Sequence, residues 1–377
     1  MKHKLDFVAN ILDDIKKENL YRQMRHGKVD GPYITIGRKR LVNFCSNDYL
    51  GLSVSQALPR QFQSSSRLVS GNDVSFMKLE RILASHKSQE SSLIFPTGYM
   101  ANLGAIPALA AKDSLILSDE LNHASIIEAC RLSRSKTLIY KHNDIDDLSK
   151  KIRANKKARK FIVTEGVFSM DGDLADLKRI SELAEKNNAI LILDDAHGDF
   201  TIGRDGRGSA SHFGVEKNID VYISSLSKGL GSFGGYAAAS KEVIDLCVNK
   251  AKSFIYTSAL PSLLVDLTLE RLKQNREVRR KKLERNVKLL STQLRRLGYD
   301  IHSQTHIVPL IIGDEKRTLE FSRYLYEKGI FAQPIRYPTV PKNNARIRIS
   351  VTAWLSDEHI EDALGVFEKA GKKFGIL

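Results

Sequence analysis

Four short polar segments of this sequence each follow or precede an apolar run, and each carries side chains that could take part in catalysis. In one of them, SSLSKGLG, Lys228 comes shortly after the apolar run of a predicted strand. A lysine amine that is accessible, and whose pKa is lowered by partial burial, can form a Schiff base with an aldehyde. Taken alone, a Ser-Lys-Gly sequence is too common to indicate this chemistry.

A pair of carboxylates, Asp194 and Asp195, lies upstream of this lysine, directly after the apolar run AILIL and before Ala196 and His197. A carboxylate at the end of a buried strand costs free energy unless it faces a positive partner. The protonated ring nitrogen of a cofactor would be such a partner, and a structural salt bridge is the alternative.

The other two segments are turns. Thr97, Gly98 and Tyr99 precede a predicted helix, whose first N–H groups and dipole would favour a phosphate. The stretch EGVFSMDG, which begins at Glu165, reads on its own as a polar turn. An acid-bearing strand, a lysine-bearing strand and an upstream glycine turn together resemble the fold-type I pyridoxal 5′-phosphate (PLP) enzymes.

The elements that must position these segments alternate between strand and helix from about residue 75 to 255. We expect strands at 114–118, 137–142, 160–167, 189–196, 220–227 and 234–240. We expect helices at 99–111, 123–133, 144–155 and 175–187. This α/β alternation predicts a mainly parallel sheet covered on both faces, with a ligand site at the carboxyl ends of its strands.

The chain is expected to divide into three parts. They are an N-terminal helix with a short β segment (1–45), a large PLP-binding domain (46–260), and a linking helix with a small α+β C-terminal domain (261–377). In the last part we expect strands at 306–312 and 346–352 and helices at 314–328 and 356–373. Ser356 is the predicted N-cap of the final helix.

Composition is that of a globular protein of 377 residues, with 42% hydrophobic and 27% charged residues. No apolar run reaches the ~18 residues that span a bilayer, and the N-terminus does not read as a signal peptide. Three separated cysteines (Cys45, Cys130 and Cys247) fit reduced thiols and share no metal-ligand spacing with a histidine. We expect a cytoplasmic protein with no metal and no membrane partner.

Much of the net charge of +15 lies in the segment 271–296, which holds eleven Lys or Arg against Glu277 and Glu284. Its apolar spacing predicts one long amphipathic helix. The charges either form a solvated face or attract a polyanionic substrate. No nucleic-acid-binding pattern accompanies them, so we expect no nucleic-acid partner. A basic, non-catalytic nucleic-acid-binding protein on the same fold is the alternative of a different class.

From end to end, the chain resembles the α-oxoamine synthases, PLP enzymes that condense an amino acid with an acyl thioester. The resemblance rests on NDYLGL (47–52), SRLVSG (66–71), LNHASI (121–126), KHND (141–144), TEGVFSMDGD (164–173), LDDAHG (193–198), GRGS (206–209), SKGLG (227–231), PTVP (338–341) and RIRISVTA (346–353). Within the family, Glu165, GRGS and IRYPTVP favour the members of biotin synthesis, which use L-alanine and a pimeloyl thioester carried on CoA or on a carrier protein. Members that use glycine with acetyl-CoA, or serine with a long acyl group, are the alternatives.

The resemblance implies a role toward PLP for each matching residue. Lys228 would carry the cofactor and later move protons, Asp194 would pair with the pyridinium nitrogen, and His123 would stack on the ring. Ser169 and His197 would hydrogen-bond the ring hydroxyl. The phosphate would be bound by Gly98, Tyr99 and Ser225 and, from a second subunit, by Thr257 and Ser258. A homodimer is therefore expected.

Substrate contacts are also implied by the resemblance. Arg348 matches the arginine that binds the amino-acid carboxylate, a role that suits its planar guanidinium. Arg346 points to the same strand face, so spacing alone does not choose between the two. Asn47 is expected near the same carboxylate, and Arg22 and Arg25 near the phosphates of the acyl carrier.

The chain departs from the family at Asp199 and Phe200, which stand where the relatives have a small-glycine turn. We expect this loop to lie near the approaching substrate. The acyl-chain preference is therefore the property that this departure would change.

Overall fold

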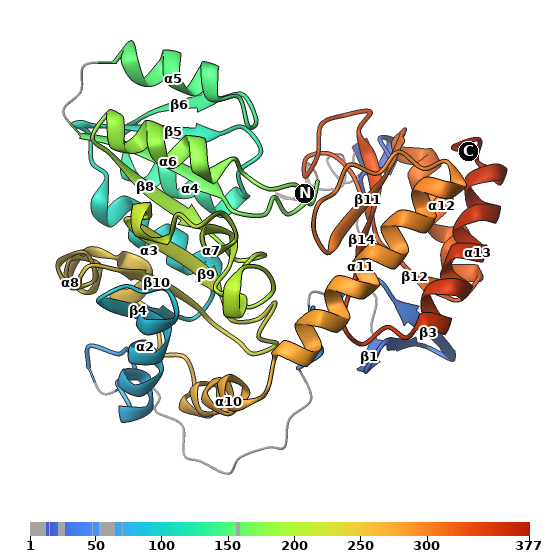
Figure 1. Cartoon of the computed structure of the whole chain (residues 1–377), viewed down its shortest axis with the longest axis horizontal. Helices are drawn as coiled ribbons and strands as arrows, with labels where there is room; N and C mark the ends of the chain where they lie inside the picture. The colour runs from blue at the N-terminus through green and yellow to red at the C-terminus, as the bar shows by residue number, and fades with distance from the viewer. Residues whose placement is uncertain are drawn as a thin grey trace, which may run out of the picture. The chain divides into compact units, whose positions relative to one another are not determined.

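The computed structural model describes residues 13–14, 16–21, 27–46, 48–52, 65–69, 71–155 and 159–377, which places most of the expected N-terminal helix outside the described part. Two compact units make up the chain (Figure 1). The larger comprises Asn47–Ser169 and Asp173–Lys281, and the smaller comprises Met1–Ser46, Met170–Gly172 and Lys282–Leu377. The three-part domain division drawn from the sequence stays a proposal.

A seven-stranded sheet forms the centre of the larger unit (Figure 1). Its strands are β4 (Ser91–Phe95), β5 (Ser114–Asp119), β6 (Lys136–Tyr140), β7 (Arg159–Glu165), β8 (Ala189–Asp194), β9 (Val221–Ser225) and β10 (Gly235–Ala239). They lie in the order β4-β10-β9-β8-β7-β5-β6, and β10 runs antiparallel to both of its neighbours. The predicted mainly parallel sheet is confirmed. Only β4 was not expected, because its sequence, SSLIF, is short and opens on two serines.

Helices surround this sheet. They are α2 (Val74–His86), α3 (Gly98–Leu109), α4 (Ala124–Ser133), α5 (Ile145–Arg153), α6 (Leu177–Lys186), α7 (Ser209–Phe213), α8 (Lys241–Lys250), α9 (Lys252–Ile255) and α10 (Ser262–Lys273). Residues of α3, α4, α8 and α9 share one hydrophobic core with the sheet, whereas α6 packs on β8 and α2 on β4. The four helices expected from the sequence correspond to α3 to α6.

Along each central strand, successive side chains point to opposite faces of the sheet. This alternation decides which side chains lie at the edge of the hydrophobic core where the strands end. β7, β8 and β9 each place one residue in the core near their carboxyl end, namely Val163, Ile192 and Ile223. A residue two positions further along a strand points to the same face. The residues in those positions are Glu165, Asp194 and Ser225. The fold therefore brings three polar side chains to one edge of the core.

Two further sheets belong to the smaller unit. One has the order β1-β2-β3-β12, with β1 (Gly27–Asp30), β2 (Tyr33–Ile36), β3 (Lys39–Asn43) and β12 (Ile330–Phe331). The other has the order β11-β14-β13, with β11 (Ile307–Gly313), β14 (Ala345–Ser350) and β13 (Pro334–Ile335). Helices α12 (Glu315–Glu327) and α13 (Asp357–Lys373) follow the sequence prediction, and Ser356 caps α13 as expected.

The basic segment 271–296 is not one helix, contrary to the prediction. Helix α10 ends at Lys273 and α11 (Glu277–Leu297) begins after a break, where Asn275 Oδ1 accepts the N–H of Glu277 and starts a new helix. Apolar spacing continues through such a break and does not reveal it. Arg271 is buried, and Arg280 donates to backbone carbonyl oxygens of the loop after β8, so part of this charge is structural rather than a solvated face. Within the described residues, we find no helix with the length and apolar content to cross a membrane.

Candidate active site

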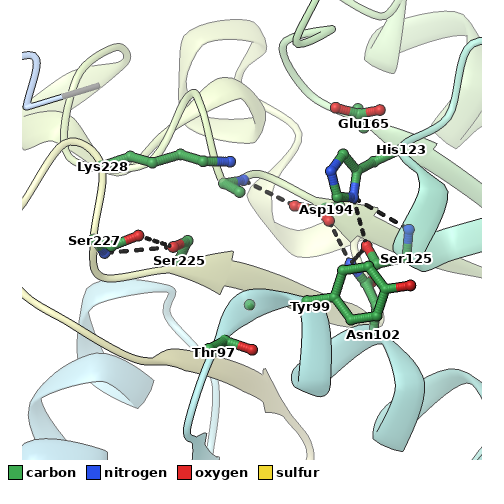
Figure 2. Close-up of a pocket in the computed structure, with 12 residues that line it drawn as sticks. Thr97, Tyr99, Asn102, His123, Ser125, Glu165, Asp194, Ser225, Ser227 and Lys228 are labelled. Carbon is green, nitrogen blue, oxygen red and sulfur yellow. Dashed lines mark hydrogen bonds between the residues drawn. The ribbon is translucent and has the colours of Figure 1, made fainter. Parts of the chain in front are cut away.

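The carboxyl ends of β7, β8 and β9 border a pocket with a cavity of about 220 Å³ (Figure 2). Six residues predicted from the sequence line it: Gly98, Tyr99, His123, Asp194, Ser225 and Lys228. Figure 2 shows the Lys228 side chain extending toward the side of the pocket where Asp194 and His123 lie. Residues from separate segments of the sequence are thus brought together in one place within the larger unit.

Asp194 is buried at the end of β8, and two donors bind its carboxylate. Asn102 Nδ2 donates to Oδ2 at 2.6 Å, and the N–H of Ala196 donates to Oδ1 at 3.0 Å. The same Asn102 amide donates to Ser125 Oγ at 2.9 Å, which fixes the amide in turn. Hydrogen bonds of this kind stabilise the charged form of a carboxyl group and orient it toward a cationic partner.

His123 begins helix α4 as its N-cap, with ring Nδ1 accepting the N–H of Ser125 at 3.2 Å. Burial lowers the pKa of the His123 imidazole; Asp194 opposes this shift, and Lys228 adds to it. The ring lies edge-on to that of Tyr99, with centroids 6.2 Å apart. A neutral aromatic ring in a pocket wall suits stacking on another planar ring.

Lys228 and His197 are in direct contact. Lys228 Nζ lies 3.0 Å from His197 Nε2, and the Tyr49 hydroxyl lies 2.8 Å from His197 Nδ1. When Lys228 is an ammonium it donates to Nε2, and Nδ1–H then donates to the Tyr49 oxygen. His197 is therefore oriented from both sides of its ring and can hold or pass a proton at the lysine amine.

The N-terminus of α3 lines another part of the pocket. Thr97 caps this 12-residue helix, with Oγ1 accepting the N–H of Met100 at 3.1 Å. The N–H groups of a first helical turn have no acceptor within the helix and suit an anion. A Cβ at Gly235 would lie 2.3 Å from the nitrogen of Gly98, so only glycine lets β10 run this close to the start of the helix.

Ser225 brings the end of β9 against the same helix start. A Cβ on Gly98 would lie 3.2 Å from Ser225 Cβ, so the two backbones are in close contact there. Ser225 Oγ and Ser227 Oγ lie 2.8 Å apart and add hydroxyl groups to the N–H groups of the helix. Together they form a site whose chemistry suits a phosphate.

Four other residues predicted for the cofactor are not among the described residues that line the pocket. Ser169 is buried in the loop after β7, and His197 contacts Lys228, but neither is among the described residues that line the pocket. Thr257 and Ser258 follow α9 and do not line it either. The role expected for these two residues concerns a second subunit and stays a prediction.

The residues predicted for the substrate lie in the smaller unit or outside the described residues. Arg346 forms an ion pair with Asp171 at 2.5 Å and so has a structural partner. Arg348, on the same strand β14, donates to Ser350 Oγ at 2.6 Å and stays our candidate for the carboxylate. Arg22, Arg25 and Asn47 are outside the described residues, and their roles stay predictions.

Six further residues line the pocket: Thr97, Asn102, Ser125, Glu165, Ala196 and Ser227. Asn102 and Ser125 had no predicted role, and neither had Tyr49 behind His197. Asn102 lies one helical turn after Gly98, so its place on the pocket side of α3 could have been inferred from helical spacing. Tyr49 carries no local signal apart from lying in the NDYLGL stretch.

Asp199 and Phe200, the departure from the family pattern, are fully buried and are not among the described pocket residues. Asp199 lies 2.7 Å from Lys87 Nζ and accepts hydrogen bonds from Ser224 and Tyr236. Burial alone would raise the pKa of Asp199, but the charges and hydrogen bonds of Lys87 and His86 together outweigh it and the pKa is lowered. The loop thus holds a buried ion pair, and a role in acyl-chain preference stays a prediction.

Residues 39–367 match the family of class I and II aminotransferases. The chain belongs to this family. Among curated members, it is similar to 8-amino-7-oxononanoate synthases from Thermoanaerobacter pseudethanolicus (42% identical, 100% of this chain and 99% of the relative) and Thermosipho melanesiensis (41%, 98% and 98%). A third, from Fervidobacterium nodosum, is 40% identical over 97% of this chain and 98% of the relative.

Two solved structures share the fold of this chain. Serine palmitoyltransferase from S. paucimobilis with bound PLP–myriocin has a TM-score of 0.92 at 25% identity, covering 99% of each chain. An 8-amino-7-oxononanoate synthase from Francisella tularensis has a TM-score of 0.77 at 25% identity, covering 89% of this chain and 99% of that one. The expected fold-type I transferase fold and the resemblance to α-oxoamine synthases are both confirmed.

Proposed function

We propose that this class I and II aminotransferase family member is a PLP-dependent acyltransferase that condenses L-alanine with a pimeloyl thioester. Carbon dioxide and the free thiol carrier leave, and the product is 8-amino-7-oxononanoate, which belongs to biotin biosynthesis. Relatives of that name, 38–42% identical over nearly the whole chain, support the assignment. The observation that carries it is the single pocket shared by Lys228, Asp194 and the start of α3.

The pocket residues fit PLP, which has an aldehyde, a basic ring nitrogen and a phosphate. Lys228 supplies an amine, and Asp194 supplies a carboxylate fixed by Asn102. The first turn of α3 and Ser225 supply N–H and hydroxyl donors where glycines permit close backbone approach. When bound, PLP supplies an electron sink that stabilises a carbanion at the α-carbon of the amino acid.

Lys228 is the proposed attachment point and proton carrier. With PLP and the amino acid bound, the Lys228 Nζ would remove the α-proton and would later return a proton to the product carbon. His197, 3.0 Å from Nζ, orients this amine and is itself oriented by Tyr49. The lysine thus works from a defined position rather than as a freely rotating chain.

Asp194 and His123 hold the cofactor ring from different directions. Asp194 would keep the ring nitrogen protonated, and a protonated ring accepts electrons from the α-carbon more readily. His123, whose pKa is lowered by burial, offers a neutral ring to the cofactor face. Arg348 would bind the alanine carboxylate until it leaves as carbon dioxide.

Serine palmitoyltransferase activity is the second candidate, because a structure of that name has the higher TM-score. We favour L-alanine because curated relatives named 8-amino-7-oxononanoate synthase are far more similar in sequence, and side chains rather than the backbone fold select the substrate. Within the family, glycine with acetyl-CoA, as in 2-amino-3-ketobutyrate CoA ligase, is the other alternative. The pocket argues against a non-catalytic nucleic-acid-binding protein.

We also propose a cytoplasmic homodimer in which Thr257 and Ser258 of each chain reach the phosphate of its partner. Ser258 is exposed and Thr257 half-buried in the single chain, which leaves both accessible to a second subunit. The molar mass from light scattering should be that of two chains, and replacing both residues by alanine should weaken PLP binding without lowering the melting temperature.

Product identification by mass spectrometry tests the function. L-alanine, glycine and L-serine are offered separately against pimeloyl-, acetyl- and palmitoyl-CoA and a pimeloyl carrier protein. We expect alanine with a pimeloyl donor to give 8-amino-7-oxononanoate and to turn over fastest. Faster turnover of glycine with acetyl-CoA, or of serine with palmitoyl-CoA, would assign the enzyme to another branch of the family.

A further inference from the structure

Glu165 ends strand β7, and its side chain reaches the pocket next to that of Asp194. The two residues are register partners on the neighbouring parallel strands β7 and β8, and both point to the face that carries the hydrophobic core. Only 3% of Glu165 is exposed. Figure 2 shows its carboxyl group on the far side of the His123 ring from Asn102. Two carboxyl groups are therefore brought to one buried wall.

The surroundings of these two carboxyl groups differ. Asp194 accepts hydrogen bonds from the Asn102 amide and the N–H of Ala196. Within the described part of the chain, Glu165 Oε1 is buried and has no hydrogen-bond partner. The backbone N–H of His123 is the donor that faces the Glu165 carboxyl group. A buried carboxylate oxygen without a donor is costly, whereas a carboxylic acid avoids most of this cost and can itself donate.

The charges that face Glu165 also favour its neutral form. Burial raises the pKa of Glu165 well above its usual value, and the negative charge of Asp194 raises it further. Lys228 and the N–H of His123 act against the shift, and Asp119, at the end of β5, acts with it. When two carboxyl groups lie side by side and only one is well hydrogen-bonded, the other retains the proton.

We propose that Glu165 holds a proton in the working enzyme and acts as a neutral positioning residue, so that Asp194 alone carries the negative charge offered to the cofactor ring. This inference rests on the proposed function. A second carboxylate would compete with Asp194 for the ring nitrogen and for the Lys228 ammonium. A neutral acid avoids that competition and presents an O–H donor on the wall beside His123.

Infrared spectroscopy of the PLP-loaded enzyme near neutral pH tests the proton directly, because a carboxylic acid and a carboxylate have separate stretching bands. We expect the difference spectrum between wild type and Glu165→Gln to contain a carboxylic-acid band. Labelling glutamate with carbon-13 in the wild type should shift the same band, which assigns it to a glutamate even if the variant folds poorly. A difference spectrum that contains only carboxylate bands, or an acid band that does not shift on labelling, overturns the proposal.

Titration with PLP tests whether Asp194 carries the negative charge and Glu165 is neutral. Glutamine keeps the shape and neutrality proposed for Glu165, so we expect Glu165→Gln to bind PLP within about threefold of the wild-type affinity. Asp194→Asn, which removes the charge itself, should weaken binding at least about tenfold. Equal weakening by the two variants would contradict the proposal. A wild-type protein that does not bind PLP would instead overturn the proposed function, so the two failures are distinguishable.

Discussion

Lys228 Nζ lies 3.0 Å from His197 Nε2, and His197 follows Asp194 by only three residues in the turn after β8. One turn therefore supplies both the carboxylate proposed for the cofactor ring and the histidine that orients the lysine amine. Tyr49, from a remote part of the sequence, fixes the other nitrogen of the His197 ring. The turn that carries Asp194 therefore also determines, through His197, where the Lys228 amine lies.

Replacing Tyr49 by phenylalanine should lower kcat by about fivefold or more, since it removes the hydroxyl that lies 2.8 Å from His197 Nδ1 in a buried site. A lost hydrogen bond of this kind is worth about 1–3 kcal/mol. Steady-state kinetics with the identified substrates measure the effect. The pH profile of kcat should shift as well, because His197 contacts the lysine that moves protons.

Tyr299→Phe provides the matched control. The Tyr299 hydroxyl is also buried, but it donates to the Phe367 carbonyl oxygen in the smaller unit. This variant should lose a similar amount of stability with kcat unchanged. If Tyr49→Phe altered only the melting temperature, Tyr49 would have no part in positioning His197.

Asp194→Asn and Asp195→Asn should separate cofactor function from stability, although the two residues are neighbours. Asp194 faces the pocket, and its loss should lower turnover by about 100-fold or more, the scale of removing one electrostatic partner from an active site. Asp195 forms a buried ion pair with Lys87 Nζ at 3.0 Å, next to the pair that Lys87 forms with Asp199. Breaking the pair with Asp195 should cost about 3 kcal/mol of unfolding free energy. Denaturant unfolding measures the stability of both variants, and PLP titration measures their cofactor affinity. A loss of PLP affinity confined to Asp195→Asn would contradict the roles assigned to the two residues.

The pH dependence of stability should reveal the charge on His142, which bridges Asp119 and Asp173 at 2.9 and 2.7 Å. Burial lowers the pKa of His142, but the hydrogen bonds and charges of the two carboxylates outweigh it and raise the pKa to about 10. Because this value lies above the unfolded pKa of about 6.5, the stabilisation is complete below about pH 6.5 and is lost as pH rises toward 10.

His142→Gln should therefore lower the unfolding free energy by about 2 kcal/mol near pH 6.5, and the difference from wild type should shrink toward pH 10. Urea unfolding at several pH values measures it. A difference that stayed constant across this range would mean that hydrogen-bond geometry, rather than the positive charge, accounts for the stability.

Phe200→Gly should destabilise the protein even though Phe200 has a left-handed φ of +63°. Glycine would relieve about 1 kcal/mol of backbone strain, but it would remove a buried ring stacked on His86, worth about 3–5 kcal/mol. Asp205 also has positive φ, at +54°, but it is exposed, so Asp205→Gly should be neutral or slightly stabilising. Thermal unfolding of the two variants compares them; a Phe200→Gly protein as stable as wild type would show that the ring contributes little packing.

Local signals predicted the part of the site that lies at strand ends. Asp194 and Lys228 each follow an apolar strand, and parallel strands end at the same edge of a sheet, so their meeting could be expected from sequence. Helical spacing after Gly98 could have placed Asn102 on the pocket side of α3, but not its bond to Asp194, which is 92 residues away. Tyr49 had no such signal, because its partner His197 is 148 residues away. The ion pair between Asp199 and Lys87 could not be predicted either, because the two residues are far apart in the sequence. The helix break after Lys273 was missed because apolar periodicity carries through it.

Reductive trapping tests the central claim most directly. Borohydride treatment of the PLP-loaded protein, followed by digestion and mass spectrometry, fixes the cofactor to whichever lysine holds it. We expect the added pyridoxyl mass on the peptide that contains Lys228, and no labelled peptide from the Lys228→Ala protein. A label on another lysine of the wild type, or no label at all, would contradict the assignment of Lys228 and with it the proposed chemistry.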